Sequence, residues 1–192
     1  MHILIIDTAT PRAALTLIKN GSVFRAPFGD RYNQSRDVPR LLQRLLKKAH
    51  LKLEAINGIA VVTGPGSFTS IRVGVSFANA LAYGQGIPVV GISLFMWATA
   101  GKKAKGTVVV DCGPSGVFVQ RGSAIMRYRQ EEFAEQNKLP RPQELEDAVL
   151  AGQASRLIAA ATRRTRAGFV PVVPFYGSKP NITTPKKSRK KR

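Results

Sequence analysis

The chain opens with ILIIDTATPRAALTLIKNGSVF, which occupies residues 3–24. The aliphatic run before Asp7 predicts a buried strand, and residues 13–18 predict a second one. Asn20-Gly21 favours a tight hairpin turn into a third strand at 22–28. The opening therefore predicts an antiparallel meander of three strands, with a carboxylate at the end of the first.

The same order of features recurs later in the chain. Residues 107–110 form another aliphatic run, which ends at Asp111 and is followed by small polar residues and a returning strand. Arg121-Gly122 then leads into a third strand at 124–128. This pattern predicts a duplicated strand-Asp-hairpin unit. Two independent meanders are the alternative interpretation.

Helical and strand patterns alternate between the two units. Apolar residues at helical spacing predict a helix over 38–49, and residues 56–62 and 87–92 read as strands. A helix at 68–83 is apolar on nearly every side, which predicts burial on two faces. Ser93 opens a short helix.

The composition of the chain changes twice along its length. Residues 101–106 look like a linker of Gly and Lys, and residues 143–165 predict one long helix in the second half. Residues 179–192 carry seven basic side chains and no acidic one. We therefore predict an N-terminal half at 1–106, a shortened C-terminal half at 107–178 and a disordered basic tail at 179–192.

The overall composition excludes several classes of protein. The chain has 192 residues, 44% of them hydrophobic, and a formal net charge of +19 that favours polyanionic partners such as tRNA. One Cys and two His cannot form an intrachain disulfide or a structural zinc site, so no metal is expected. No apolar stretch approaches the ~18 residues of a membrane span. We expect a cytoplasmic protein without a membrane segment.

Two loops are candidates for binding phosphate. Asp7, Thr8 and Thr10 end a strand where open sheets present ligands, and Asp111 repeats that position. An Asx turn is the alternative for Asp7.

The second loop, Gly64-Pro65-Gly66-Ser67, precedes a helix N-terminus, where free amides favour an anion. Its glycines do not have the spacing of a P-loop, and close packing of the turn is the alternative. His2 and His50 have no evident Ser or Cys partner, so nucleophilic hydrolysis is poorly supported.

Three segments of the first half carry a family resemblance. ILIIDTAT at 3–10 is followed by IAVVTGPGSFTSIRVG at 59–74 and IPVVGIS at 87–93. Together they resemble the bacterial TsaB family, with GPGSFT as the longest specific match. The resemblance implies an α/β, actin-like ATPase fold of two ribonuclease-H-like halves, of which the second is shortened here.

The resemblance also implies a role. TsaB proteins are non-catalytic partners of TsaD, which makes threonylcarbamoyladenosine on tRNA and links them to TsaE. We therefore expect a scaffold without catalytic residues, ATP or ADP only at a shared interface, and a possible homodimer when TsaD is absent. The helices predicted at 38–49 and 68–83 are expected to dock TsaD through four apolar residues, namely Leu41, Leu45, Ala78 and Leu81.

Two other classes of function remain open at this point. The fold also hosts ATP-dependent and peptidase-like enzymes, which hydrolysis by the isolated chain would reveal. A generic basic RNA-binding protein would agree with the net charge, but the core has no cluster of aromatic residues for stacking bases.

Overall fold

A five-stranded sheet forms the centre of the computed structural model, which describes residues 1–29, 34–99, 106–163 and 169–177. The strand order is β3-β2-β1-β4-β5. The predicted meander is confirmed, because β1 pairs antiparallel with β2, and β2 with β3. β4 and β5 extend the sheet parallel to β1. The strands are β1 (His2–Asp7), β2 (Ala14–Lys19), β3 (Ser22–Pro27), β4 (Gly58–Gly64) and β5 (Val89–Ser93).

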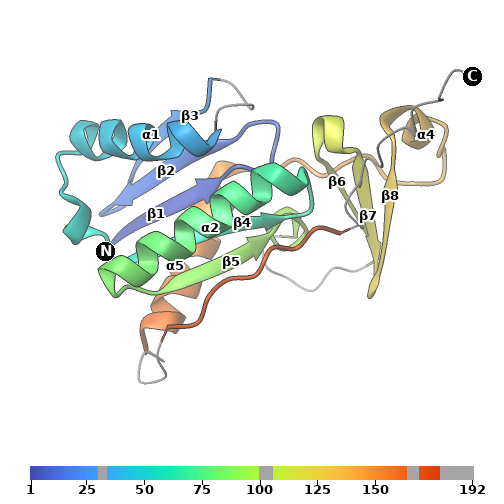
Figure 1. Cartoon of the computed structure of the whole chain (residues 1–192). Coiled ribbons are helices and arrows are strands. Elements are labelled where there is room, and N and C mark those ends of the chain that lie inside the picture. The colour runs from blue at the N-terminus through green and yellow to red at the C-terminus, as the bar shows by residue number, and fades with distance from the viewer. Residues whose placement is uncertain (30–33, 100–105, 164–168, 178–192) are drawn as a thin grey trace, which may run out of the picture.

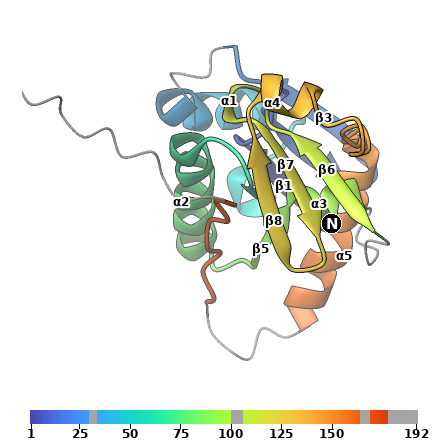
Figure 2. The same ribbon diagram turned by 90° about the vertical axis from the view of Figure 1, so that its right-hand side faces the viewer.

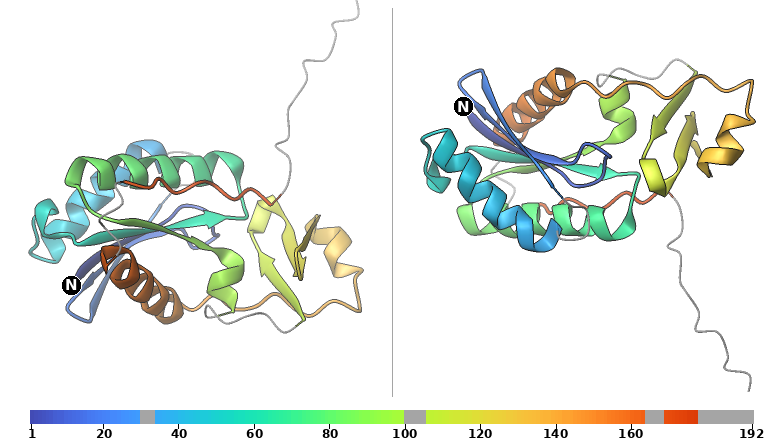
Figure 3. Two further views of the ribbon diagram at one scale, coloured as in Figure 1. Left: turned by 90° about the horizontal axis from the view of Figure 1, so that it is seen from below. Right: turned by 90° about the horizontal axis from the view of Figure 1, so that it is seen from above.

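Helices cover both faces of this sheet. α1 (Gln34–Lys48) and α2 (Phe68–Gln85) pack on one face, and α3 (Leu94–Ala98) and α5 (Asp147–Arg163) pack on the other, as Figure 3 shows from below and above. β4 is buried along its whole length, which explains its nearly continuous aliphatic sequence.

The position of α5 differs from the predicted division into halves. Its buried residues Leu150, Ala154 and Ile158 belong to the same core as β1 and β4. A Cβ at Gly58 would lie 2.5 Å from Ile158 Cγ2, so helix and strand are in close contact. The range 107–178 is thus shared between two places in the fold, because the second face of the large sheet needs an apolar cover. The residues predicted as linker and tail lie outside the described ones, apart from Gly106.

The second unit forms a small sheet at one end of the molecule (Figures 1 and 2). Its order is β6-β7-β8, the same meander as in β1 to β3. Both units also have a two-residue turn between their second and third strands, at Lys19↔Ser22 and Arg121↔Ala124. The predicted repeat of the strand-Asp-hairpin order is confirmed. The elements of this unit are β6 (Thr107–Asp111), the short 3-10 turn η2 (Gly113–Ser115), β7 (Val117–Arg121), β8 (Ala124–Tyr128) and α4 (Gln130–Ala134). A second 3-10 turn, η1 (Leu53–Ala55), precedes β4 in the large sheet.

The chain returns to the large sheet after α5. We call residues 169–177 the return segment, which runs beside α2 and β5 in Figure 1. Asn79 on α2 bonds both backbone groups of Val172, with N–O distances of 2.9 Å. Near the start of α5, the Trp97 indole Nε1 donates to the Glu146 carbonyl at 2.7 Å. These bonds attach the C-terminal elements to the first half.

Among the helices in the described part of the chain, none is long and apolar enough to cross a membrane.

Candidate functional site

Asp7 is held inside its own hairpin. Its Oδ1 accepts hydrogen bonds from the backbone N–H groups of Ala9 (2.9 Å) and Thr10 (3.1 Å), and its Oδ2 accepts one from the Thr10 hydroxyl. Burial raises the pKa of Asp7, although these hydrogen bonds and the charge of Arg25 act in the opposite direction. The Asx turn, rather than an open phosphate loop, is therefore what the structure contains.

The two threonines of this hairpin are also engaged within the protein. The Thr8 hydroxyl donates to the Ser70 carbonyl at 2.7 Å, and Thr10 Oγ1 accepts from the Arg12 N–H at 3.2 Å. Gly74 lies directly against Thr8, since a Cβ there would be 2.3 Å from Thr8 Oγ1. The hairpin is thus fastened to the first turns of α2.

Asp111 repeats this turn at the surface. Its Oδ1 accepts from the Gly113 N–H at 2.7 Å and from Gln130 Nε2 at 2.8 Å. The residue is exposed, whereas Asp7 is buried. Both carboxylates therefore shape a hairpin loop, and they do so in different surroundings.

The turn at residues 64–67 is packed against the chain on several sides. Gly64 has φ +111°, and a Cβ there would lie 2.3 Å from the Phe175 carbonyl oxygen. A Cβ at Gly66 would lie 3.0 Å from the Ala9 carbonyl oxygen. Ser67 caps α2 by accepting the Ser70 N–H at 3.4 Å. The glycines thus permit close packing, which was the alternative to an anion site.

This turn is also where the two units meet. The Cys112 thiol donates to the Pro65 carbonyl at 3.3 Å, and a Cβ at Gly177 would lie 2.9 Å from Pro65 Cβ. Sequence reasoning did not predict these contacts or that of Phe175. No local pattern indicates them, because Phe175 and Cys112 lie far from residues 64–67 in the sequence.

Some of the groups in these loops that could bind a phosphate are engaged within the chain. The Ala9 and Thr10 amides that could bind it are bonded to Asp7, and the backbone of the turn faces Phe175 and Cys112. Within the described residues, His, Cys, Asp and Glu form no group of three or more that could hold a metal ion. The candidate loops serve the packing of the fold.

The four predicted docking residues divide into two pairs. Leu45 is 2% exposed and Ala78 is 0% exposed, and both belong to the core. The prediction is wrong for these two, because they pack inside the chain and offer no surface. Leu41 and Leu81 are half-buried and pack against the core from outside.

The outer face of α2 is the more unusual surface. Arg72 is the one charged residue among its 18 residues, and its guanidinium lies 4.7 Å from the centre of the Phe68 ring. Tyr83 is 73% exposed and meets Phe169 edge-on, with ring centres 5.4 Å apart. We call the exposed residues of this helix the α2 face, and they are Thr69, Arg72, Ser76, Ala80, Tyr83 and Gly84.

Comparison with protein families now adds to this geometry. The model of the family TsaD, tRNA N6-adenosine threonylcarbamoyltransferase, matches residues 31–182. The chain belongs to this family. The matched range includes α1, the turn at 64–67, α2 and the return segment.

The curated relatives of this chain include TsaB proteins and threonylcarbamoyltransferases. The tRNA threonylcarbamoyladenosine biosynthesis protein TsaB of Escherichia coli K12 is 38% identical over 103 residues, which are 53% of this chain and 44% of that protein. The tRNA N6-adenosine threonylcarbamoyltransferase of Geotalea daltonii is 51% identical over 53 residues, or 28% of this chain and 16% of that one. The chain thus matches less than half the length of these relatives.

The identity of 38% to TsaB of Escherichia coli confirms the TsaB resemblance, and solved structures add the likeness of the fold. YeaZ from Pseudomonas aeruginosa matches with a TM-score of 0.61 at 16% identity, over 83% of this chain and 94% of that one. A protein described as similar to peptidase YEAZ, from the same organism, matches with a TM-score of 0.63 at 17% identity, over 92% and 99%. At such identities the likeness shows the fold, and it is the fold that the TsaB resemblance implied.

Proposed function

We propose that this chain is a non-catalytic subunit in the biosynthesis of threonylcarbamoyladenosine on tRNA. The names of its relatives support the pathway, since one is a threonylcarbamoyladenosine biosynthesis protein and another a threonylcarbamoyltransferase. In this proposal TsaD performs the transfer, and the chain shapes or stabilises TsaD by binding to it. TsaE would join the complex by binding TsaD.

The α2 face is the observation that carries the docking part of the proposal. Arg72 is the one charged residue among the exposed positions of α2, which is unusual because solvent-facing positions of a helix are normally rich in charged residues. Small residues at Ser76, Ala80 and Gly84 allow another backbone to approach closely, and Tyr83 offers a rigid aromatic anchor. Leu41 and Leu81 flank this face as half-buried apolar residues. The same face would serve a homodimer when TsaD is absent.

The carboxylates support a non-catalytic role. Asp7 and Asp111 stand where an actin-like site would collect its acids, and both bind their own hairpin loops. His2 lies 3.0 Å from the Ala55 carbonyl through Nδ1, on the edge of η1. Each of these groups has a structural task. A nucleotide shared with TsaD stays a prediction.

The docking proposal is tested with TsaD from the same organism. Ala80→Glu places a carboxylate in the centre of the α2 face and should weaken binding on the order of 100-fold, because the charge would be buried without a partner. Ala134→Glu, at an exposed position of α4, is the matched control and should bind like the wild type. Titration calorimetry measures both affinities. Wild-type affinity of Ala80→Glu would contradict docking through α2.

A further inference from the structure

A ridge of basic side chains runs along the outside of α1. Four of them recur at intervals of four residues, so they lie on one side of the helix over ~18 Å. All of them are exposed. We call this set the α1 ridge, and it consists of Arg36, Arg40, Arg44, Lys47 and Lys48.

The ridge is nearly without ion pairs among the described residues. Its single ion pair joins Arg36 to Asp37, with 3.5 Å between Nε and Oδ1. Elsewhere the chain does pair its arginines, since Arg12 and Arg25 both reach Asp147. Like charges four residues apart destabilise an isolated helix. Repulsion within the ridge therefore lowers the stability of the folded chain, and a bound polyanion would relieve this repulsion.

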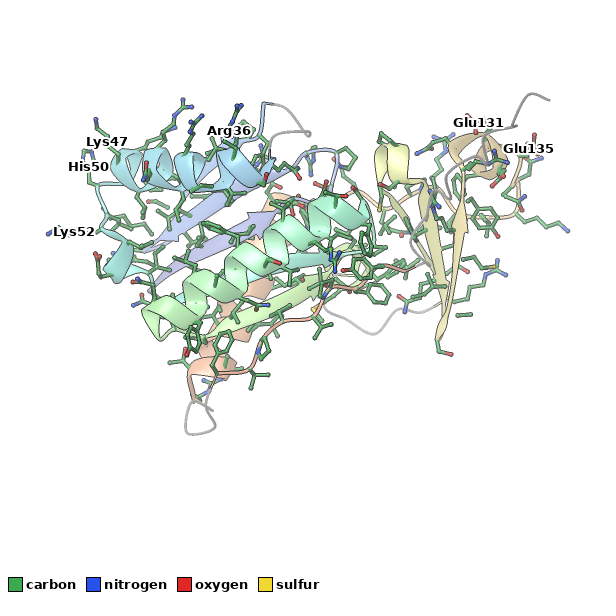
Figure 4. All side chains as sticks on the ribbon, viewed as in Figure 1. Arg36, Lys47, His50, Lys52, Glu131 and Glu135 are labelled. Atoms are coloured by element: carbon green, nitrogen blue, oxygen red, sulfur yellow. The ribbon has the colours of Figure 1, made fainter. Side chains whose placement is uncertain are left out.

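Lys52 continues the positive charge past the end of the helix. Figure 4 shows Arg36, Lys47, His50 and Lys52 projecting from α1 and the following loop. The exposed acidic residues Glu131, on α4, and Glu135, directly after it, lie at the opposite end of the molecule in the same view. The molecule thus has a basic end and a more acidic end, which would orient it in the field of a polyanion.

We propose that the α1 ridge binds the phosphate backbone of RNA without reading its sequence. The exposed residues beside the basic ones are Ser35, Pro39 and Gln43, so the ridge lacks the large apolar or aromatic centre that anchors a protein partner. It also lacks aromatic side chains on which bases could stack. Arginine and lysine along a straight helix suit phosphate oxygens.

This assignment goes beyond the proposed docking of TsaD. The ridge is on the outer side of α1, whereas docking is assigned to the α2 face. In the assembled complex the ridge would hold tRNA that TsaD modifies. RNA binding by the chain alone can be measured without TsaD, so the two proposals can fail separately.

The test uses the full-length chain and a labelled RNA duplex. The ridge variant is Arg40→Gln/Arg44→Gln/Lys48→Gln, and fluorescence anisotropy at several salt concentrations measures its affinity. We expect an affinity about tenfold or more below the wild type at low salt, and a slope of log affinity on log salt that is shallower by up to about 2.7. Circular dichroism should show an unchanged fold, because the changes remove repulsion.

The matched control removes three positive charges from the small-sheet end, as Arg121→Gln/Lys138→Gln/Arg141→Gln. These residues are also exposed. Because both variants replace three basic residues by Gln, they have the same net charge. It should retain most of the RNA affinity. Equal losses in the two variants would overturn the proposal, since net charge alone would then explain binding. Loss of TsaD binding with an unchanged salt slope would also overturn it, and would assign the ridge to an acidic protein surface.

Discussion

The two strand-Asp-hairpin units share a topology but differ in what surrounds them. The first is extended by β4 and β5 and covered by helices on both faces, so Asp7 is 5% exposed. The second remains a three-stranded sheet with a small core of Val109, Val117 and Val119, and Asp111 is exposed. A repeated sequence pattern therefore specifies a local turn, whereas the neighbouring elements decide whether that turn lies in a core or at a surface.

The largest expected effect concerns the helix that covers the first unit. Ala78→Glu should lower the free energy of unfolding by about 3–5 kcal/mol, because it buries a carboxylate without a partner. Ala80→Glu, two residues further on the exposed side, should leave the free chain nearly as stable as the wild type. Urea unfolding followed by circular dichroism compares the two. Similar stabilities would mean that α2 does not cover the first unit as described.

The next effect tests to which unit α5 belongs. Ile158→Ala should cost about 2–5 kcal/mol, because the side chain fills the space beside Gly58 in the large core. Val119→Ala in the small core should cost less, since it removes one buried carbon atom fewer. Hydrogen exchange should show that Ile158→Ala loosens the amides of β1 and β4. Loosening confined to the small sheet would contradict the position of α5.

A smaller effect concerns the joint between the units. Gly64→Ala should destabilise the chain by about 1 kcal/mol or more, because Gly64 has a positive φ and the Phe175 carbonyl leaves no room for a Cβ. Movement of the backbone to make room for the new Cβ should also disturb the contact between Pro65 and Cys112. Labelling with a thiol reagent should therefore modify the buried Cys112 faster in the variant. An unchanged labelling rate would mean that the two units are joined elsewhere.

The smallest effect distinguishes the two carboxylates by pH. Because burial raises the pKa of Asp7 above its ordinary value of 3.8, the folded state holds its proton more tightly than the unfolded state does. Wild-type stability relative to Asp7→Asn should therefore fall as pH rises from below 3.8 through the folded pKa, and then level off. Thermal unfolding across this range measures the difference. A rise over the same window would contradict a raised pKa of Asp7 and would mean that its hydrogen bonds outweigh the effect of burial.

Local patterns in the sequence were sufficient for much of the fold. Aliphatic runs that end at Asp7 and Asp111 identified both meanders, because strand period and turn chemistry act over a few residues. The small polar residue Ser67 and the glycines before α2 marked the start of that helix correctly. The apolar character of α2 was also predicted from the sequence, yet Ala78 was assigned to a partner surface. The reason is that an apolar residue can be covered either by its own chain or by a partner, and its sequence position does not distinguish the two.

Tertiary structure alone decided which surfaces meet. The apolar residues Leu150, Ala154 and Ile158 predict a helix, but nothing in their spacing says that the helix crosses to the first sheet. The same holds for Phe175, which reaches the turn at Gly64 from more than a hundred residues away. Turns and helix caps depend on neighbours in the chain, whereas burial depends on how distant apolar faces are shared among elements. For that reason the sequence by itself determined the elements and the two Asp turns of this protein, and only the folded chain determined which residues remain for a partner.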